Sequence, residues 1–198
     1  IAVRVSNAHN EVVPPLGGDL GHFGGIYRSV YLIKTPPAYF DLGYYGSCGI
    51  LVDTPRVSAE AATVRVRARV RNDSTSARNL RVVSQITDPE GKPCGEVSAA
   101  IEVALGQVGQ TDTTSSAIAR PRLWSPDAPN VYLVRHRLLD EHTTEVLDEV
   151  ETPLGFRWFS IDADRGFFLN GQHCYIQGVA RHQDYSGLGY AVPYEVLV

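Results

Sequence analysis

The stretch Thr63-Val-Arg-Val-Arg-Ala-Arg-Val-Arg71 decides the fold class of this 198-residue chain. Three valines and one alanine alternate in it with four arginines. Because successive side chains of a β-strand point to opposite faces of the sheet, this period of two predicts a strand with one buried face and one solvated face. The arginine row is therefore interpreted as the solvated face of a sheet rather than as a nucleic-acid-binding stripe.

More strands are predicted downstream of this stretch, at Leu80–Thr87, Glu96–Val103, Thr113–Ala119, Val131–Leu139 and Thr144–Glu151. Turn sequences separate them, among them Asn72-Asp-Ser-Thr-Ser76, whose glycosylation sequon is interpreted as a loop only, and Asp88-Pro-Glu-Gly91. The run Pro121–Pro129 contains three prolines, which exclude a helix and a central strand there. Short strands at this spacing, without a helical period of similar length, predict an all-β sandwich from about Ala38 to about Gly155.

Composition and charge exclude several classes of protein. The net charge of −4 leaves no electrostatic footprint for nucleic acid, and no apolar run approaches the ~20 residues of a membrane-spanning helix. The three cysteines lie far apart, without disulfide or zinc spacing, and are expected to be free thiols. The chain begins on a strand-like Ala2–Val5 and ends as a helix starts at Pro193, so we expect both ends to be cut from a longer protein.

Three stretches, in order, resemble glycoside hydrolase family 2, the β-galactosidase-like family. Gly18-Asp-Leu-Gly-His-Phe-Gly-Gly-Ile-Tyr-Arg28 is similar to the sequence near the end of the family's sugar-binding jelly roll. Leu123-Trp-Ser-Pro-Asp-Ala-Pro-Asn-Val-Tyr-Leu133 is similar to a run inside its immunoglobulin-like domain. Gly155-Phe-Arg157, Gly166–Gly171 and Gly178–Asp184 are similar to the beginning of its catalytic (β/α)₈ barrel.

The resemblance implies a division of the chain into three parts. Residues 1–37 would be the end of the jelly roll, 38–155 an immunoglobulin-like β-sandwich and 156–198 the start of the TIM barrel, with short strand remnants at both ends. The sandwich would then be a spacer between the sugar-binding domain and the barrel. A stand-alone carbohydrate-binding or adhesion module is the alternative, and the barrel-like sequence after Gly155 argues against it.

The family also implies a retaining glycosidase, most simply a β-galactosidase, acting through two carboxyl groups about 5–5.5 Å apart. Both are glutamates late in the family's barrel, which needs roughly 250 residues, so no catalytic residue is expected in this chain and it should be inactive alone. No cofactor is expected for the chain itself, although the resemblance implies a Mg or Na ion near the sugar site of the longer enzyme. Relatives often carry Asn and Glu where this chain has Ala180 and Gln183, so the resemblance does not fix the glycone.

Two residues are carried over as substrate-binding. Asp19 matches the jelly-roll aspartate that binds a sugar hydroxyl or a cation, since a carboxylate accepts charge-assisted hydrogen bonds. His182 matches the histidine at the mouth of the barrel. Without the family, Asp19 would be interpreted as a turn residue and His182 as an ordinary loop histidine.

Several other motifs have plainer interpretations. Asp162-Ala-Asp-Arg-Gly166 lacks the spacing of a calcium loop and predicts a hairpin turn. The cluster Tyr39, Phe40, Tyr44 and Tyr45 is expected to be buried at a domain junction rather than to stack on sugars.

The expected partners follow from the same resemblance. They are the carbohydrate substrate of the longer enzyme and that enzyme's other domains, with no nucleic acid and no membrane. Because five apolar side chains would lose their neighbours in an isolated chain, we also expect homo-oligomers by dimerisation or strand exchange. These side chains are Ile26, Tyr27, Phe167, Phe168 and Tyr175.

Overall fold

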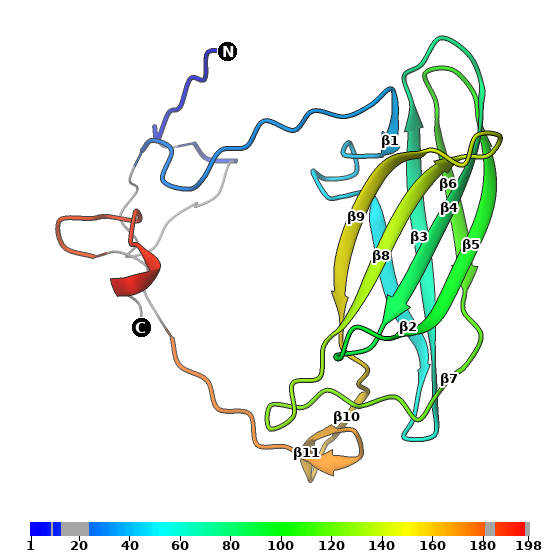
Figure 1. Ribbon diagram of the computed structural model, residues 1–198. Coiled ribbons are helices and arrows are strands. Elements are labelled where there is room, and N and C mark those ends of the chain that lie inside the picture. The colour runs from blue at the N-terminus through cyan, green and yellow to red at the C-terminus, as the bar shows by residue number, and fades with distance from the viewer. Residues whose placement is uncertain (9, 13–23, 181–184, 197–198) are drawn as a thin grey trace. The chain divides into compact units, whose positions relative to one another are not determined.

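The structure is a computed structural model that describes residues 1–8, 10–12, 24–180 and 185–196 (Figure 1). It divides into two compact units. One consists of Ile1–Ile33 together with Gln177–Val198, and the other is Lys34–Ile176.

The larger unit is an antiparallel β-sandwich with a small third sheet (Figure 1). Its strands are β1 (Ala38–Phe40), β2 (Ile50–Val57), β3 (Ala61–Asn72), β4 (Arg78–Thr87), β5 (Pro93–Val103), β6 (Val108–Thr114), β7 (Ile118–Ala119), β8 (Tyr132–Asp140) and β9 (Val146–Leu154). In the first sheet β3 is central, with β1 and β2 along one side and β6 and β7 along the other. The second sheet has the order β5-β4-β8-β9.

The core lies between these two sheets. Val64, Val66 and Val70 of β3 are at most 2% exposed and belong to one buried cluster with apolar side chains of β4 and β8, such as Leu80 and Leu138. Removing these side chains from water is the dominant favourable contribution to folding. The predicted sandwich fold is therefore confirmed.

The outer face of β3 carries the arginine row, as predicted. Arg65 and Arg67 pair with Asp53, and Arg65 also pairs with Asp112. Arg69 pairs with Asp41 at 3.0 Å, and Arg71 pairs with Asp73 at 2.8 Å. The carboxylates come from β2, β6 and the residues that flank β1 and β3, so the row is neutralised within the sandwich.

Most predicted strands are present with slightly different ends, but three details differ. The predicted strand Thr113–Ala119 is two strands, β6 and β7, because the Ser115 side chain interrupts the ladder: its Oγ accepts a hydrogen bond from the Val64 N–H at 3.0 Å. Strands β1 and β2 were not predicted. The strand predicted at Ala2–Val5 is wrong, since these residues belong to no sheet, and a strand needs a hydrogen-bonded neighbour.

The two predicted turns have the expected local chemistry. The sequon residue Asn72 is completely buried, and its amide donates hydrogen bonds to the carbonyls of Ser76 and Val103 at 2.8 and 2.9 Å. Its side chain therefore has a structural role in closing the loop. Gly91 has a φ of 82° and donates to the Asp88 carbonyl, which closes the Asp88–Gly91 turn.

A third small sheet follows the sandwich. Strands β10 (Phe159–Asp162), β11 (Gly166–Leu169) and β12 (Gln172–His173) pair in this order, so Asp162–Gly166 is the predicted hairpin turn. Asn170 ties this sheet to the residues that precede it. Its backbone N–H donates to the Trp158 carbonyl, its Oδ1 accepts from the Trp158 N–H, and its amide donates to the Trp124 carbonyl at 2.9 Å.

The smaller unit contains little regular structure. Its one described helix is a short 3₁₀ turn, η1 (Tyr194–Val196), directly after Pro193, where the sequence predicted the start of a helix. All described residues of this unit are half-buried or exposed. Within the described residues, the helix found is too short and too polar to span a bilayer.

Candidate functional site

The two substrate-binding residues predicted from the sequence, Asp19 and His182, lie outside the described residues. The structure does describe the segments that follow each of them, Gly24–Tyr27 and Tyr185–Ala191. Both segments belong to the smaller unit.

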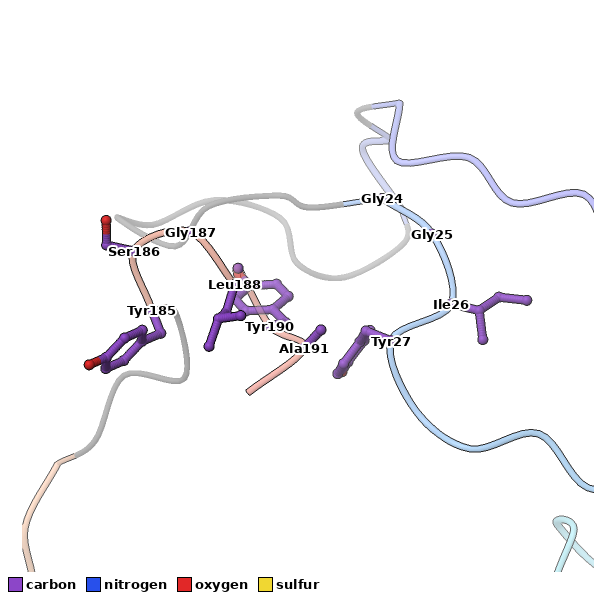
Figure 2. A pocket seen from close by; sticks show the side chains of 11 residues that line it. Gly24, Gly25, Ile26, Tyr27, Tyr185, Ser186, Gly187, Leu188, Tyr190 and Ala191 are labelled. Atoms are coloured by element: carbon purple, nitrogen blue, oxygen red, sulfur yellow. The ribbon is translucent and has the colours of Figure 1, made fainter. Parts of the chain in front are cut away.

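The two segments share a pocket of about 670 Å³ (Figure 2). Its lining combines three tyrosines, one serine, two aliphatic side chains, alanine and four glycines. These residues are Gly24, Gly25, Ile26, Tyr27, Tyr185, Ser186, Gly187, Leu188, Gly189, Tyr190 and Ala191. Segments more than 150 residues apart in the sequence thus meet at one site, because residues 24–27 and 185–191 line the same space.

A ring contact joins the two sides of this pocket. The ring centroids of Tyr27 and Tyr190 lie 5.8 Å apart at an interplanar angle of 56°. The guanidinium of Arg28 lies 5.4 Å from the centroid of the Tyr27 ring. Figure 2 shows that the side chain of Ile26 points away from the turn that carries Tyr190. The Tyr27–Tyr190 ring pair thus connects the two segments.

The second segment forms a tight turn whose residues line the pocket. Tyr185 and Gly189 exchange backbone hydrogen bonds of 3.1 and 2.9 Å, and the Leu188 N–H donates to the Tyr185 carbonyl. Gly187 has a φ of 80° and Gly189 a φ of 56°, values that side chains rarely tolerate. The glycines therefore make the turn, and the residues between and around them supply its chemistry.

This arrangement suits a polar ring-shaped ligand. Tyrosine offers an apolar ring face and a hydroxyl that donates and accepts hydrogen bonds, and Ser186 adds a second kind of hydroxyl. The described lining contains no carboxylate or imidazole, and no group of three or more metal-ligating side chains occurs among the described residues. The described part of the site therefore offers hydroxyl groups and ring faces to a ligand.

The buried histidine of the sandwich is a structural residue. His136 is completely buried, and its ring nitrogens lie 2.7 Å from Ser84 Oγ and 2.9 Å from Thr152 Oγ1. Burial lowers the pKa of His136 from 6.5 to about 4, since desolvation disfavours the charged imidazolium. A neutral ring with both nitrogens satisfied and no exposure has no access to substrate.

The other sequence candidates are not among the residues that line the pocket. The three cysteines are free, as expected, and burial raises the pKa of the Cys94 thiol. In the tyrosine-rich cluster, Phe40 is buried in the core, whereas Tyr45 is 92% exposed. Sequence reasoning named Tyr27 only for packing and did not single out Tyr185 or Tyr190. A sequence feature that could have indicated these two residues is the pair of tyrosines at the ends of the glycine-containing stretch Tyr185-Ser-Gly-Leu-Gly-Tyr190.

The sequence model of Glycosyl hydrolases family 2 matches residues 51–157, which cover more than half of the chain. This chain belongs to glycosyl hydrolase family 2. The match confirms the resemblance stated from the sequence, and the immunoglobulin-like sandwich is the fold shared with solved members of the family.

Individual relatives cover nearly the whole chain. It is 33% identical over 192 residues to beta-galactosidase BoGH2A of Bacteroides ovatus, covering 97% of this chain and 21% of that protein. It is 33% identical over 195 residues to a beta-glucuronidase of Bacteroides fragilis, covering 97% of this chain and 27% of that protein. Among solved structures, a Bacteroides uniformis beta-glucuronidase matches with a TM-score of 0.91 and 36% identity, covering 96% of this chain and 23% of the other. The chain thus spans about a fifth to a quarter of these relatives.

Proposed function

We propose that this chain is a non-catalytic part of a retaining glycoside hydrolase that cleaves β-galactosides. The main support is the alignment with the β-galactosidase from B. ovatus, which covers 97% of this chain but only 21% of that protein. A retaining glycosidase needs two carboxyl groups about 5–5.5 Å apart, which we assign to glutamates of the longer enzyme outside these 198 residues. The chain alone would then be inactive.

Within that enzyme, we assign residues 1–37 to the end of a sugar-binding domain, 38–155 to a spacer and 156–198 to the start of the barrel. The sandwich strands β1 to β9 run from Ala38 to Leu154, which supports the assignment of the middle part. The four arginines on the outer face of β3 are paired with carboxylates of the same sandwich, and nineteen hydrophobic residues form its buried core. Such an element suits a spacer that fixes the positions of residues 1–37 and 156–198, which would contact the sugar.

The sugar site would combine Asp19 and His182 with the tyrosine pocket. Asp19 lies five residues before Gly24, and His182 lies three residues before Tyr185, so each precedes one wall of the pocket. A carboxylate accepts hydrogen bonds from sugar hydroxyls, an imidazole donates or accepts one, and the tyrosine rings offer apolar faces. These residues would bind the sugar and leave bond cleavage to the two glutamates.

The experiment uses the full-length protein that carries this chain, assayed on aryl β-galactosides and aryl β-glucuronides. We expect Asp19→Asn and His182→Gln to lower kcat/KM by about tenfold to a hundredfold, since each removes a hydrogen bond to the sugar. Asp127→Asn and His142→Gln are matched controls on exposed residues and should stay within about twofold. The 198-residue chain assayed alone should give no turnover.

Two results would contradict this proposal. Absence of hydrolysis of both glycosides by the full-length protein would remove the enzyme assignment. Unchanged kinetics in Asp19→Asn and His182→Gln would remove the two residues from the sugar site.

A β-glucuronidase is the second candidate, favoured by the B. fragilis and B. uniformis relatives with that name. The same assay separates the two. A kcat/KM at least tenfold higher on the glucuronide would replace the galactoside proposal.

A further inference from the structure

A second pocket lies in the larger unit, at the end of the sandwich where β2 leads into β3. Its volume is about 600 Å³, within the range of small-molecule sites. Figure 1 shows this end of the sandwich near β7 and β10. The lining comes from four parts of the chain, namely residues 54–58, residues 61–63, Ala117 and the pair Arg157-Trp158.

The arginines at this pocket differ from those elsewhere in the sandwich. Ten arginines of the larger unit form ion pairs with carboxylates. These are Arg65, Arg67, Arg69, Arg71, Arg78, Arg81, Arg122, Arg135, Arg137 and Arg165. Within Lys34–Ile176, all of which the structure describes, only Arg56, Arg120 and Arg157 make no such pair. Two of these three, Arg56 and Arg157, line this one pocket.

Both guanidiniums are available to a ligand. Arg56 is exposed and lies where the pairing register of β2 with β3 shifts, an irregularity of the kind that re-aims side chains next to binding sites. Arg157 is exposed, and its guanidinium carbon lies 4.6 Å from the centroid of the Trp124 ring, a cation–π contact that helps to hold the side chain. Neighbouring Asp53 is engaged by Arg65 and Arg67, and exposed Glu60 does not line the pocket.

The remaining lining suits a sugar ring beside the anionic group. Trp158 lines the pocket, and both its backbone N–H and its carbonyl are bound by Asn170, so its backbone is held before any ligand arrives. Thr54 and Thr63 line the pocket and make no hydrogen bond through their hydroxyls within this fully described unit. An aromatic face, free hydroxyls and two guanidiniums form a set that matches a pyranose bearing a carboxylate.

We propose that the pocket of Arg56, Arg157 and Trp158 binds an acidic saccharide, with the carboxylate of a uronic acid between the guanidiniums and its ring against the indole. This site is separate from the tyrosine pocket of the smaller unit. The inference holds whether the longer enzyme cleaves galactosides or glucuronides, because it rests on residues of the larger unit alone.

The test is a titration of the ¹⁵N-labelled chain with sodium glucuronate, followed by NMR. The chain has only two tryptophans, Trp124 and Trp158. Their two indole N–H signals are assigned by mutating one of these residues. We expect a saturable shift of the Trp158 signal with glucuronate, and no shift with glucose at the same concentration. Arg56→Gln should weaken binding about tenfold or more, since it removes one charge-assisted contact.

Arg120→Gln is the matched control, because Arg120 is also exposed and unpaired but does not line the pocket. It should bind glucuronate as the unchanged chain does. Thermal unfolding of both variants checks that each is folded. Equal affinity in Arg56→Gln, or an equal response to glucose, would overturn the proposal.

Two further titrations show whether the shift reports saccharide binding and whether the pocket is open in the longer enzyme. Saturation by sodium acetate at the same affinity would mean that the pocket binds simple anions, which would overturn the saccharide assignment. The titration is then repeated with the full-length protein. Binding by the chain that is lost in that protein would mean that another part of the enzyme covers the pocket, and would overturn the proposal too.

Discussion

The sandwich unit and the smaller unit differ in how far their apolar side chains are buried. In the sandwich, nineteen hydrophobic residues form one buried cluster, and Val64, Val70 and Leu80 have no exposed surface. In the smaller unit, every described residue is half-buried or exposed, and Tyr31 and Leu32 are 81% and 85% exposed. The sandwich is therefore held by its own core, while the smaller unit is held by a few ring and backbone contacts.

This difference separates stability from function in the chain. Burial of apolar surface contributes roughly 25 cal/mol per Å², so almost all of the folding free energy should reside in the sandwich. The tyrosine pocket, by contrast, belongs to the unit without a core. Substitutions can therefore be chosen that act on one unit and leave the other unchanged.

The largest expected effect comes from truncating a ring in the sandwich core. Phe156 has no exposed surface and packs edge-to-face on Tyr132 with centroids 4.7 Å apart. Phe156→Ala should lower the free energy of unfolding by about 3–5 kcal/mol, because it loses the burial of the ring and leaves a cavity. The measurement is equilibrium unfolding in urea, monitored by tryptophan fluorescence.

Tyr31→Ala is the counterpart in the smaller unit. Since Tyr31 is 81% exposed, its truncation should change the free energy of unfolding by less than about 0.5 kcal/mol. A loss of similar size in both variants would contradict the view that the sandwich alone holds the core.

The second prediction concerns pH and again acts on the sandwich. His136 has a pKa of about 4 in the folded chain because of burial, against 6.5 for an exposed histidine. The folded state therefore binds fewer protons than the unfolded state, so this contribution is fully present above about pH 6.5 and is lost as the pH falls towards 4. The loss should reach about 3 kcal/mol at the low end of this window.

Urea unfolding at half-unit pH steps between 7 and 4 measures this loss. His136→Gln retains hydrogen-bonding groups for Ser84 and Thr152 but does not titrate, so its stability should be nearly flat across the same window. The carboxylate of Asp140, whose pKa is lowered by the backbone N–H groups of Thr143 and His142, acts below this window. An unchanged slope in His136→Gln would assign the pH dependence to other groups.

The sequence predicted those strands whose pattern is set by burial on one face. In β3, β4 and β8 buried and less buried residues alternate along nearly the whole strand, so the period of two survives in the sequence. Strand β6 is mostly polar, and its place depends on pairing with β3 and on the fit of Gly109, where an added Cβ would lie 2.6 Å from Ile101 Cδ1. A three-dimensional fit of this kind leaves no periodic signal.

The candidate sites show the same limit. Asp19 and His182 came from the family resemblance, and no local pattern distinguishes them from turn and loop residues. The tyrosine pocket depends on segments more than 150 residues apart. The pocket of Arg56, Arg157 and Trp158 depends on which arginines lack a carboxylate partner. Both facts follow from tertiary structure, so sequence patterns alone could not supply them.

The smallest expected effect lies at the border of the sandwich, where the β10–β12 sheet is attached through Asn170. Asn170→Gly tolerates the positive φ of 52° but loses the side-chain bonds to Trp124 and Trp158. We expect a loss of about 1–2 kcal/mol, because two hydrogen bonds to half-buried backbone groups are removed. Hydrogen exchange should show faster exchange of the Trp158 amide and of β11, with the amides of β3 and β4 unchanged. Equal acceleration in β3 and β4 would instead mean that the small sheet and the sandwich unfold as one cooperative unit, and the border would have to be moved beyond β12.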